Sequence, residues 1–565
     1  MNTTNPHIQS RTVSAQLETR LRNAGYSALE ARLYAARGIG DEHELEYDLT
    51  RLIPWSQLKG AAEAAVRLAD AIARQERILI VADYDADGAT ACAIGMKGLS
   101  LLGATIGFVV PNRFEYGYGL TPEIVELAAA QSPDLILTVD NGIASVAGVA
   151  AAKARGIDVL ITDHHLPGDQ LPDALIVNPN QPGCDFPSKN LAGCGVMFYV
   201  LMALRAQMRE RGAFADKPEP NLGQLLDLVA LGTVADVVKL DANNRILVEH
   251  GLKRMRSGKA SAGVLALFNA AGRNPQRASC FDLGFTLGPR LNAAGRLDDM
   301  SLGIACLLAG SEQAALPLAS ELDQMNRARR DIEAGMRDEA EIILASVNVA
   351  DSWSICLYRA DWHQGVVGIV ASRVKEQFHR PTLVFADGGE GEIKGSGRSI
   401  PGLHLRDALD LVSKRHEGLI LKFGGHAMAA GLSLRTEDFA RFQQAFEAVC
   451  RELMPATALE RIIETDGALP QESYNMDVVA RLDHQVWGQG FPAPKFHDEF
   501  RVLEQRVVGE RHLKVKLATR FGMVLDGIRF GSPQPLPDKV TAVFSISINE
   551  FRGERILQLQ LEHCE

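Results

Sequence analysis

Between about residues 60 and 180, the chain alternates short apolar runs with alanine-rich stretches of helical periodicity. The apolar runs, which we expect to be buried strands, are RILIVAD, TIGFVVPN, DLILTVDNG, DVLITDHH and ALIVNPN. The stretches between them, such as TPEIVELAAAQ and SVAGVAAAKARG, have the pattern of helices. Strand–helix repetition of this kind predicts an α/β domain with a doubly wound, mainly parallel sheet. Ligands of such sheets gather at the carboxyl ends of the strands.

The hydrophobic pattern of the remaining chain predicts further parts around this sheet. We divide the chain into an N-terminal helical segment (1–50), a first α/β domain whose second half is mostly helical (51–310), a long connecting helix (311–346), a smaller second α/β domain (347–457) and a C-terminal all-β module (458–565). Short alternating runs in the last part predict a five-stranded, OB-like barrel. We expect removal of residues from about 460 onward to leave the two α/β domains intact.

Composition narrows the class of protein. Of the 565 residues, 46% are hydrophobic and 23% charged, as in an ordinary globular protein of several domains. The net charge of -11 disfavours a nucleic-acid coat protein but not a nucleic-acid enzyme. No apolar leader or membrane-length apolar run is present, so we expect a cytoplasmic protein. The eight cysteines form no CxxC pair, which favours reduced thiols over disulfides or structural zinc.

An unusual run of acidic residues follows the first predicted strand. Asp83, Asp85 and Asp87 alternate along VADYDADGAT, so an extended chain would point all three carboxylates the same way. Like charges this close raise one another's pKa, and either solvent or a divalent cation must compensate them. The alternative for a single aspartate after a strand is the N-cap of the next helix.

Three further polar clusters follow in apolar surroundings, and we expect all four clusters at strand ends of one sheet. The additional candidates are Asp140 in TVDNG, Asp163, His164 and His165 in TDHH, and Asp236 in LGTVADVV. Carboxylates with imidazole suit Mn²⁺ and also Mg²⁺. Two such ions, roughly 3.5–4 Å apart and bridged by a carboxylate, would clamp a phosphoryl group during in-line displacement. The adjacent histidines could alternatively be merely exposed or hydrogen-bonded.

These clusters also carry a family resemblance. In this order and spacing, DYDADG, VDNG, TDHH and GTVADV resemble the four motifs of the DHH phosphoesterase superfamily. GSGRS at 395–399 and FGGHAMAAGL at 423–432 are similar to its DHHA1 domain. With GPRLNAAGRLDD at 288–299, the resemblance narrows to the bacterial members that are single-strand-specific 5′→3′ DNA exonucleases. Those members also carry an OB fold after DHHA1, and the resemblance runs from roughly residue 30 to the end.

The resemblance implies a set of ligands for two Mn²⁺ or Mg²⁺ ions: Asp85, Asp87, Asp140, His164 and Asp236. Asp140 would be the bridging carboxylate. His165 would lie by the scissile phosphate, and Asp163 is assigned with it to catalysis. Many members have a histidine where this chain has Val81, so we expect Asp83 to be either an auxiliary ligand or a residue that orients the ligands.

The resemblance also implies contacts to the DNA strand, because arginine forks and closely approached backbone N–H groups bind phosphate. Ser396 and Arg398 would hold the 5′-terminal phosphate; a tight turn is the alternative for GSGRS. Arg113 could pair a phosphate contact with stacking on Phe114 or Tyr116, or be part of a surface loop. Lys514 and Lys516 would line a DNA groove or a merely solvated strand face. The complete set of expected contacts is Arg113, Arg290, Asn292, Arg296, Ser396, Arg398, Gly424, Gly425 and His426.

The leading hypothesis is therefore an exonuclease that hydrolyses single-stranded DNA from the 5′ end to 5′-mononucleotides, in recombination and repair. The alternatives are a phosphodiesterase of short oligonucleotides or cyclic dinucleotides, whose chains are generally smaller and lack the β module, and a non-catalytic single-strand-binding scaffold. No P-loop or Gly-x-Ser-x-Gly pattern is present. The resemblance implies single-strand-binding protein and a RecQ-type helicase as partners.

Overall fold

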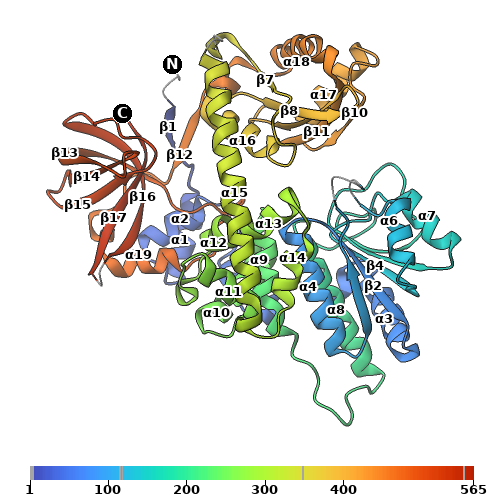
Figure 1. Cartoon of the computed structure of the whole chain (residues 1–565). Helices are drawn as coiled ribbons and strands as arrows, with labels where there is room; N and C mark the ends of the chain where they lie inside the picture. The colour runs from blue at the N-terminus through green and yellow to red at the C-terminus, as the bar shows by residue number, and fades with distance from the viewer. Residues whose placement is uncertain (1–5, 113–115, 117–118, 346–348, 552–553) are drawn as a thin grey trace. The chain divides into compact units, whose positions relative to one another are not determined.

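A parallel sheet of five strands forms the centre of the first α/β domain, as the apolar runs predict (Figure 1). Its order is β3 (Thr105–Val109), β2 (Arg77–Ala82), β4 (Leu135–Val139), β5 (Asp158–Thr162) and β6 (Leu175–Val177). The central strands are buried along almost their whole length because helices cover both faces. Strand order reverses at β2, so the crevice expected for a ligand opens at the carboxyl ends of β2 and β4.

Two hydrophobic clusters show which helices cover which face. Residues of α3 (Ala61–Arg74), α4 (Ala86–Leu101) and α8 (Gly193–Glu210) share one cluster with Ile78, Ile80 and Leu137. Residues of α6 (Pro122–Ala129) and α7 (Val146–Ala154) share the other with Leu79 and Ile136. The doubly wound architecture is confirmed.

The chain in this computed structural model is described over residues 6–112, 116, 119–345, 349–551 and 554–565. It forms two compact units, residues 1–9 with 327–464 and residues 10–326 with 465–565. The 34-residue helix α15 (Glu312–Ala345) runs through the boundary at residue 327, close to the connecting helix that the periodicity predicts. Within the described residues, no helix is both long and apolar enough to cross a bilayer.

The second half of the first domain is helical, as expected. It contains α9 (Leu226–Ala235), α10 (Ala242–Arg256), α11 (Ala262–Ala270), α12 (Cys280–Asp282), a π-helical turn η6 (Leu283–Leu287), α13 (Gly288–Leu297) and α14 (Ser301–Leu308). The N-terminal segment forms α1 (Ala15–Asn23) and α2 (Ala28–Ala35), followed by short 3₁₀ turns. A small two-stranded sheet pairs β1 (His7–Ser10) with β12 (Ile462–Thr465).

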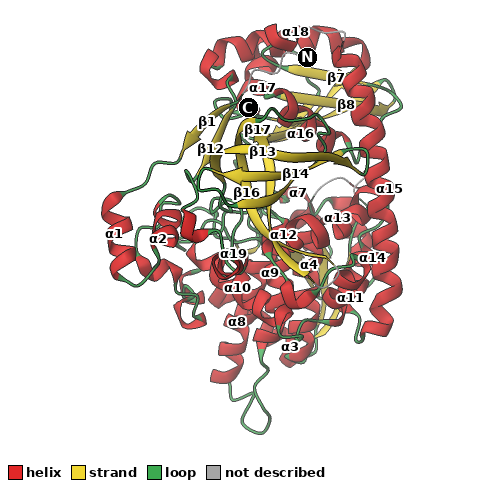
Figure 2. Ribbon diagram, turned by 90° about the vertical axis from the view of Figure 1, so that its left-hand side faces the viewer, coloured by secondary structure: helices red, strands yellow, loops and turns green. Residues whose placement is uncertain are grey.

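The C-terminal part is a closed five-stranded barrel (Figure 2). Its order is β13 (Phe496–Val508), β14 (His512–Thr519), β15 (Val524–Arg529), β17 (Glu554–Cys564) and β16 (Lys539–Phe551). A short helix, α19 (Met476–Asp483), precedes it. The apolar–polar alternation of the sequence therefore predicts this barrel correctly, since inward positions such as Leu513, Val515 and Leu517 are buried.

The contacts of the C-terminal part argue against the expectation that it can be removed without harm. Residues 465–565 belong to the same compact unit as residues 10–326 and share one hydrophobic cluster with them. Tyr34 of α2 stacks on Trp487 at 6.0 Å between ring centroids. The buried Arg37 guanidinium forms an ion pair with Asp466 at 2.9 Å. Breaking such a buried pair is strongly destabilising, because one charge is left uncompensated.

The second α/β unit has a mixed sheet of five strands. Its order is β10 (Lys422–Gly425), β11 (Ala429–Arg435), β9 (Glu392–Arg398), β8 (Thr382–Gly389) and β7 (Ile355–Tyr358). The helices α16 (Val367–Phe378), α17 (Leu405–Arg415) and α18 (Phe439–Leu453) complete it. β7 and β8 run parallel, whereas the other neighbours are antiparallel.

Candidate active site

The first acidic motif turns from strand β2 into helix α4. Asp85 is the N-cap of α4, and its Oδ1 accepts the backbone N–H groups of Asp87 at 2.9 Å and Gly88 at 3.0 Å. Asp83, Asp85 and Asp87 therefore do not lie along one extended segment, because helix capping bends the chain between them. Asp87 lies within the first turn of α4 and points its carboxylate elsewhere. Capping by Oδ1 leaves Asp85 a second oxygen, so the cap and the ligand interpretations are compatible.

Asp87 is held by the start of helix α8. Its Oδ2 accepts the backbone N–H of Gly193 at 2.6 Å, and its Oδ1 accepts that of Cys194 at 3.0 Å. These are N–H groups that a helix N-terminus leaves without intrahelical partners. A Cβ on Gly193 would lie 2.6 Å from the Asp140 side chain, so only glycine fits here. The AGCG segment at 192–195 is thus part of the site, although sequence reasoning missed it.

Asp140 follows β4 in a left-handed backbone conformation, with φ at 62°. Asn141 keeps this turn in place, because its Nδ2 donates to the carbonyls of Val81 at 3.1 Å and Val139 at 2.9 Å. The amide thereby ties the carboxyl ends of β2 and β4 together. Asp83 and Asp140 consequently project from neighbouring strand ends.

Asp163 organises the turn that carries the two histidines. Its carboxylate accepts the N–H groups of Ile143, His164 and His165 and also the His165 Nδ1 at 2.8 Å. Burial raises the pKa of Asp163, but the hydrogen bonds from His165 and the Ile143 N–H, together with the nearby histidines, outweigh it and the net shift is downward. Burial lowers the pKa of His165, but the hydrogen bond and charge of Asp163, together with the Asp83 and Asp236 carboxylates, outweigh it and bring that pKa to about 9. Asp163 is therefore engaged in orienting the His165 ring.

Asp236 lies at the carboxyl end of helix α9, where it is the C-cap. The expectation that all four polar clusters lie at strand ends is therefore wrong for this one. Val237 follows with φ at 65°, a left-handed conformation that is costly for a β-branched residue. The strained turn ends the helix directly at the candidate ligand.

The candidate ligand atoms converge on three overlapping groups. Within each group the atoms lie within 4.8 Å of one another: Asp83, Asp85 and Asp140 in the first, Asp140, His164 and His165 in the second, and Asp87, His164 and Asp236 in the third. His164 Nε2 lies 3.1 Å from Asp140 Oδ1 and 3.6 Å from Asp236 Oδ2. Among the described residues, neither His164 Nε2 nor Asp236 Oδ2 has a hydrogen-bond partner, although both atoms are buried. Donor atoms aimed at a common point without hydrogen bonds fit a metal centre.

The electrostatics of the cluster lead to the same conclusion. Burial, and after it the Asp85 carboxylate, raises the pKa of Asp83 well above its ordinary value. Burial and Asp87 do the same to the pKa of Asp140. Burial together with a neighbouring carboxylate raises the pKa values of Asp87 and Asp236 to about 7. These carboxylates cannot all be ionised at neutral pH unless cations neutralise them.

Helix α13, which carries the GPRLNAAGRL motif, packs directly on the first acidic turn. Asn292 Oδ1 accepts the backbone N–H of Ala86 at 2.8 Å, and a Cβ on Gly295 would lie 1.8 Å from the Tyr84 carbonyl. Arg290 donates to Asp323 Oδ1 at 2.8 Å and to the Thr286 carbonyl at 2.6 Å. These contacts position the motif; the substrate contacts expected for Arg290, Asn292 and the partly buried Arg296 stay predictions.

The GSGRS motif is neither a loop nor the tight turn considered as its alternative. It belongs to the central strand β9, which pairs with β8 on one side and β11 on the other. Gly395 and Gly397 make room for Phe385 and Leu383, whereas Ser396 and Arg398 point to the opposite face. The backbone N–H groups of this segment serve the sheet, so the side chains are what it can offer a phosphate.

Ser396 and Arg398 form a small polar site under the start of helix α16. Arg398 Nη1 donates to Ser396 Oγ at 3.1 Å, and a Cβ on Gly368 would lie 3.1 Å from Arg398 Nη2. Burial lowers the pKa of the Arg398 guanidinium, which remains charged. The arginine is thus partly desolvated, a condition that strengthens binding to an anion.

The second DHHA1-like motif lies on β10 and β11, of which β11 is the neighbour of β9. Gly424 and Gly425 end β10, β10 pairs with β11, and Ala429 of β11 is opposite Arg398. Gly425 has φ at 142°, and His426, which is exposed, donates its backbone N–H to Ala429 O at 2.7 Å. The topology therefore gathers both expected phosphate-binding motifs in one sheet.

The other expected contacts have different outcomes. Arg113 and Phe114 lie outside the described residues, whereas Tyr116 is partly buried against the α6–α7 cluster. Lys514 and Lys516 lie on the outer face of β14, as their alternation predicts, and Lys516 Nζ is 3.3 Å from Glu504. The DNA groove at these lysines stays a prediction.

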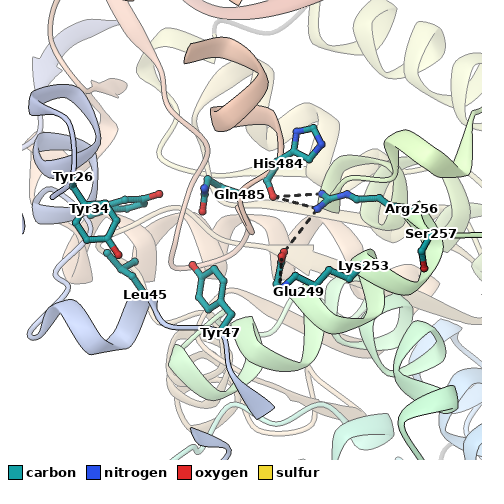
Figure 3. Close-up of a pocket in the computed structure, with 10 residues that line it drawn as sticks. All are labelled: Tyr26, Tyr34, Leu45, Tyr47, Glu249, Lys253, Arg256, Ser257, His484 and Gln485. Carbon is teal, nitrogen blue, oxygen red and sulfur yellow. Dashed lines mark hydrogen bonds and ion pairs between the residues drawn. The ribbon is translucent and has the colours of Figure 1, made fainter. Parts of the chain in front are cut away.

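A hollow of about 600 Å³ lies away from all these residues, between the N-terminal segment, α10 and the loop after α19 (Figure 3). Tyr26, Tyr34 and Tyr47 form one wall. On the opposite wall, Arg256 reaches the His484 carbonyl at 3.4 Å and Glu249 at 3.9 Å. It contains no predicted site residue, so we do not assign the chemistry to it.

The fold and the site together define the class of the protein, a phosphoesterase of the DHH type. Family models match in succession the DHH family, N-terminal domain, at residues 77–233, the DHHA1 domain at 347–452 and the RecJ OB domain at 465–563. The architecture expected from the motifs is thereby confirmed.

The chain belongs to the RecJ family. It is 51% identical over 545 residues to the single-stranded-DNA-specific exonuclease RecJ of Salmonella typhimurium, covering 94% of each chain. It is 50% identical over 546 residues to that of Escherichia coli, covering 94% of this chain and 95% of the relative. A crystal structure of Thermus thermophilus RecJ in complex with Mn²⁺ matches with a TM-score of 0.82 at 30% identity, covering 99% of this chain and 79% of that one.

Proposed function

We propose that this chain is a metal-dependent exonuclease that hydrolyses single-stranded DNA from its 5′ end and releases 5′-mononucleotides, in recombination and repair. The observation that carries the proposal is the buried convergence of Asp83, Asp85, Asp87, Asp140, His164 and Asp236 in a member of the RecJ family. An intact set of ligand atoms argues against the non-catalytic scaffold.

Two divalent ions would be shared among these ligands. Asp83, Asp85 and Asp140 would hold one ion, and Asp87, His164 and Asp236 the other, with Asp140 adjacent to both groups. Asp83 would then replace the ligand that Val81 cannot provide. Bound divalent ions supply Lewis acidity and charge neutralisation for hydrolysis of a phosphodiester. Relatives of known structure were solved with Mn²⁺ and with Mg²⁺, which supports either ion here.

The protein side chains contribute binding and positioning. His165 would contact an oxygen of the scissile phosphate while Asp163 fixes its ring. Ser396 and Arg398 would hold the 5′-terminal phosphate, with Gly424, Gly425 and His426 on the adjoining strands. Charge-assisted hydrogen bonds of this kind are strong and directional. A pocket for the terminal phosphate would explain degradation that starts at the 5′ end.

Further parts of the proposal rest on the family resemblance. The proposed domain limits are 51–310, 347–457 and 458–565, and the family matches at 77–233, 347–452 and 465–563 lie within them. The OB barrel would bind the strand away from the chemistry. Single-strand-binding protein and a RecQ-type helicase would be its partners. A cytoplasmic location is supported by eight cysteines without a disulfide among the described residues.

The test uses one long single strand, labelled at either its 5′ or its 3′ end, with Mn²⁺. The 5′ label should appear at once as a mononucleotide, whereas the 3′ label should remain in steadily shortening strands. Asp140→Asn, which keeps the side-chain shape, is the matched inactive control. Activity confined to strands of a few nucleotides would support the short-oligonucleotide phosphodiesterase instead, and loss of the 3′ label first would contradict the polarity.

A further inference from the structure

Two phenylalanines are exposed on the surface of the helical half of the first domain. Phe281 of α12 is 58% exposed and Phe285 of the π-helical turn is 74% exposed. Their rings stack on each other, with centroids 5.0 Å apart and planes at 26°. A stacked pair of aromatic rings exposed to this extent is typical of a binding surface. A π-helical turn within a helical run is also frequent at functional sites.

The two rings belong to a continuous stripe that ends at the metal centre. Along α12, η6 and α13, the positions 281, 285, 292 and 296 face solvent at least in part, whereas Leu283, Leu287 and Leu291 are fully buried. Spacings of four and seven residues keep side chains on one face of a helix. Asn292 holds the backbone of the first acidic turn, and Phe285 lies about 10 Å before it at 1.5 Å per residue.

The opposite end of the stripe reaches the barrel. Arg277, four residues before Phe281, forms an ion pair with Glu550 of β16 at 2.6 Å. Metal centre, aromatic pair and barrel therefore follow one another along a single compact unit.

We propose that Phe281 and Phe285 form a base-stacking platform for single-stranded DNA between the metal centre and the OB barrel; this deepens the proposed function and rests on it. Every base has a flat face, so stacking on phenylalanine binds a strand regardless of its sequence. An exonuclease that degrades strands of any sequence requires such binding. The outward face of Phe285 would receive one base while Phe281 supports the ring from behind. The platform would hold the strand in register between hydrolytic steps.

The test combines ring variants with substrates that lack bases. Phe285→Ala should weaken single-strand binding, measured in EDTA, by about tenfold and raise KM on long strands by a similar factor, as expected for one lost stacking contact. Phe285→Trp, which keeps a flat ring, should bind like the wild type. Abasic nucleotides along the platform should weaken the wild type but have little effect on Phe285→Ala. Ile342→Ala, which truncates an apolar side chain that is 73% exposed, is the matched control.

The results separate this proposal from the one on which it depends. Unchanged affinity and KM in Phe285→Ala would overturn the platform, as would an equal loss on normal and abasic strands, which would indicate a backbone contact or a protein-binding surface. A wild-type protein that degrades no single strand would instead overturn the proposed function. Should Phe285→Ala fail to fold, Phe285→Leu keeps the apolar bulk without the flat ring and should show the same loss.

Discussion

Replacing Asp236 by asparagine should stabilise the metal-free protein at alkaline pH while abolishing its activity. Asp236 Oδ2 is buried without a hydrogen bond among the described residues, and burial together with Asp85 raises the pKa of Asp236 from 3.8 to about 7. Because one pKa unit corresponds to about 1.4 kcal/mol, this shift corresponds to about 4 kcal/mol. The side chain is 20% exposed to solvent, so we expect roughly 2–4 kcal/mol.

The sign of the effect follows from proton binding. Between about pH 4 and pH 7 the unfolded chain releases the Asp236 proton whereas the folded chain retains it, so the free energy of unfolding falls as pH rises. Above pH 7 the ionised Asp236 destabilises the folded state by the full 2–4 kcal/mol expected above. Asparagine does not titrate, and its absence of charge also removes the main ionic cause of the raised pKa of Asp87. The variant should therefore match the wild type near pH 4 and exceed it at pH 8.

The assay is thermal unfolding in EDTA at pH 5 and pH 8, with and without excess Mn²⁺. The variant should unfold several degrees higher than the wild type at pH 8, and much less so at pH 5. Mn²⁺ should reverse the order, because it binds the complete carboxylate set more tightly. Asp169→Asn, an exposed aspartate in the loop after β5, is the control and should change little. A variant no more stable than the wild type at pH 8 would refute the assignment of buried, mutually repelling carboxylates.

Three other perturbations test separate parts of the account. Gly193→Ala should abolish hydrolysis while single-strand binding persists, because its Cβ would lie 2.6 Å from the Asp140 side chain. Gly310→Ala, with open space around it, is the control. An active Gly193→Ala variant would show that the start of α8 and the Asp140 turn can move apart. Arg398→Ala should weaken binding of 5′-phosphorylated strands by about 1.5–3 kcal/mol in a competition assay. An equal loss of affinity for 5′-hydroxyl strands would mean that Arg398 contacts the body of the DNA strand rather than its 5′-phosphate. Arg435→Ala of β11 is the control. A chain ending at Glu464 should unfold at a lower temperature or be proteolysed faster, since Arg37 and Tyr34 lose Asp466 and Trp487; unaltered stability would mean that the barrel is independent after all.

Much of the fold could be predicted because buried strands are visible in the sequence as apolar runs. RILIVAD at 77–83 contains β2 (Arg77–Ala82), and KVTAVFSISINEF coincides with β16 (Lys539–Phe551). Four of the six candidate ligands follow directly from this, since Asp83, Asp85, Asp140 and His164 lie just beyond strand ends. Asp87 lies on a helix and Asp236 at a helix end instead. The acidic run indicated Asp87 and the apolar surroundings indicated Asp236, but the strand pattern placed neither of them correctly.

What could not be predicted depends on contacts between distant segments. Gly193 lies 106 residues from the Asp87 carboxylate that it holds, and no local pattern reveals that pairing. The glycines of GSGRS suggest a loop, but they lie in a strand because Phe385 and Leu383 fill the space beside them. Packing of the barrel on α2 through Trp487 is likewise a tertiary contact that alternation within the barrel does not encode.

The central claim is that two divalent ions share this cluster of carboxylates and imidazole. Anomalous diffraction from crystals grown with Mn²⁺ measures it directly. Two Mn²⁺ peaks should appear, one at Asp83, Asp85 and Asp140 and one at Asp87, His164 and Asp236, and Asp236→Asn should lose or weaken the second peak selectively. A single peak, or peaks away from these residues, would contradict the account.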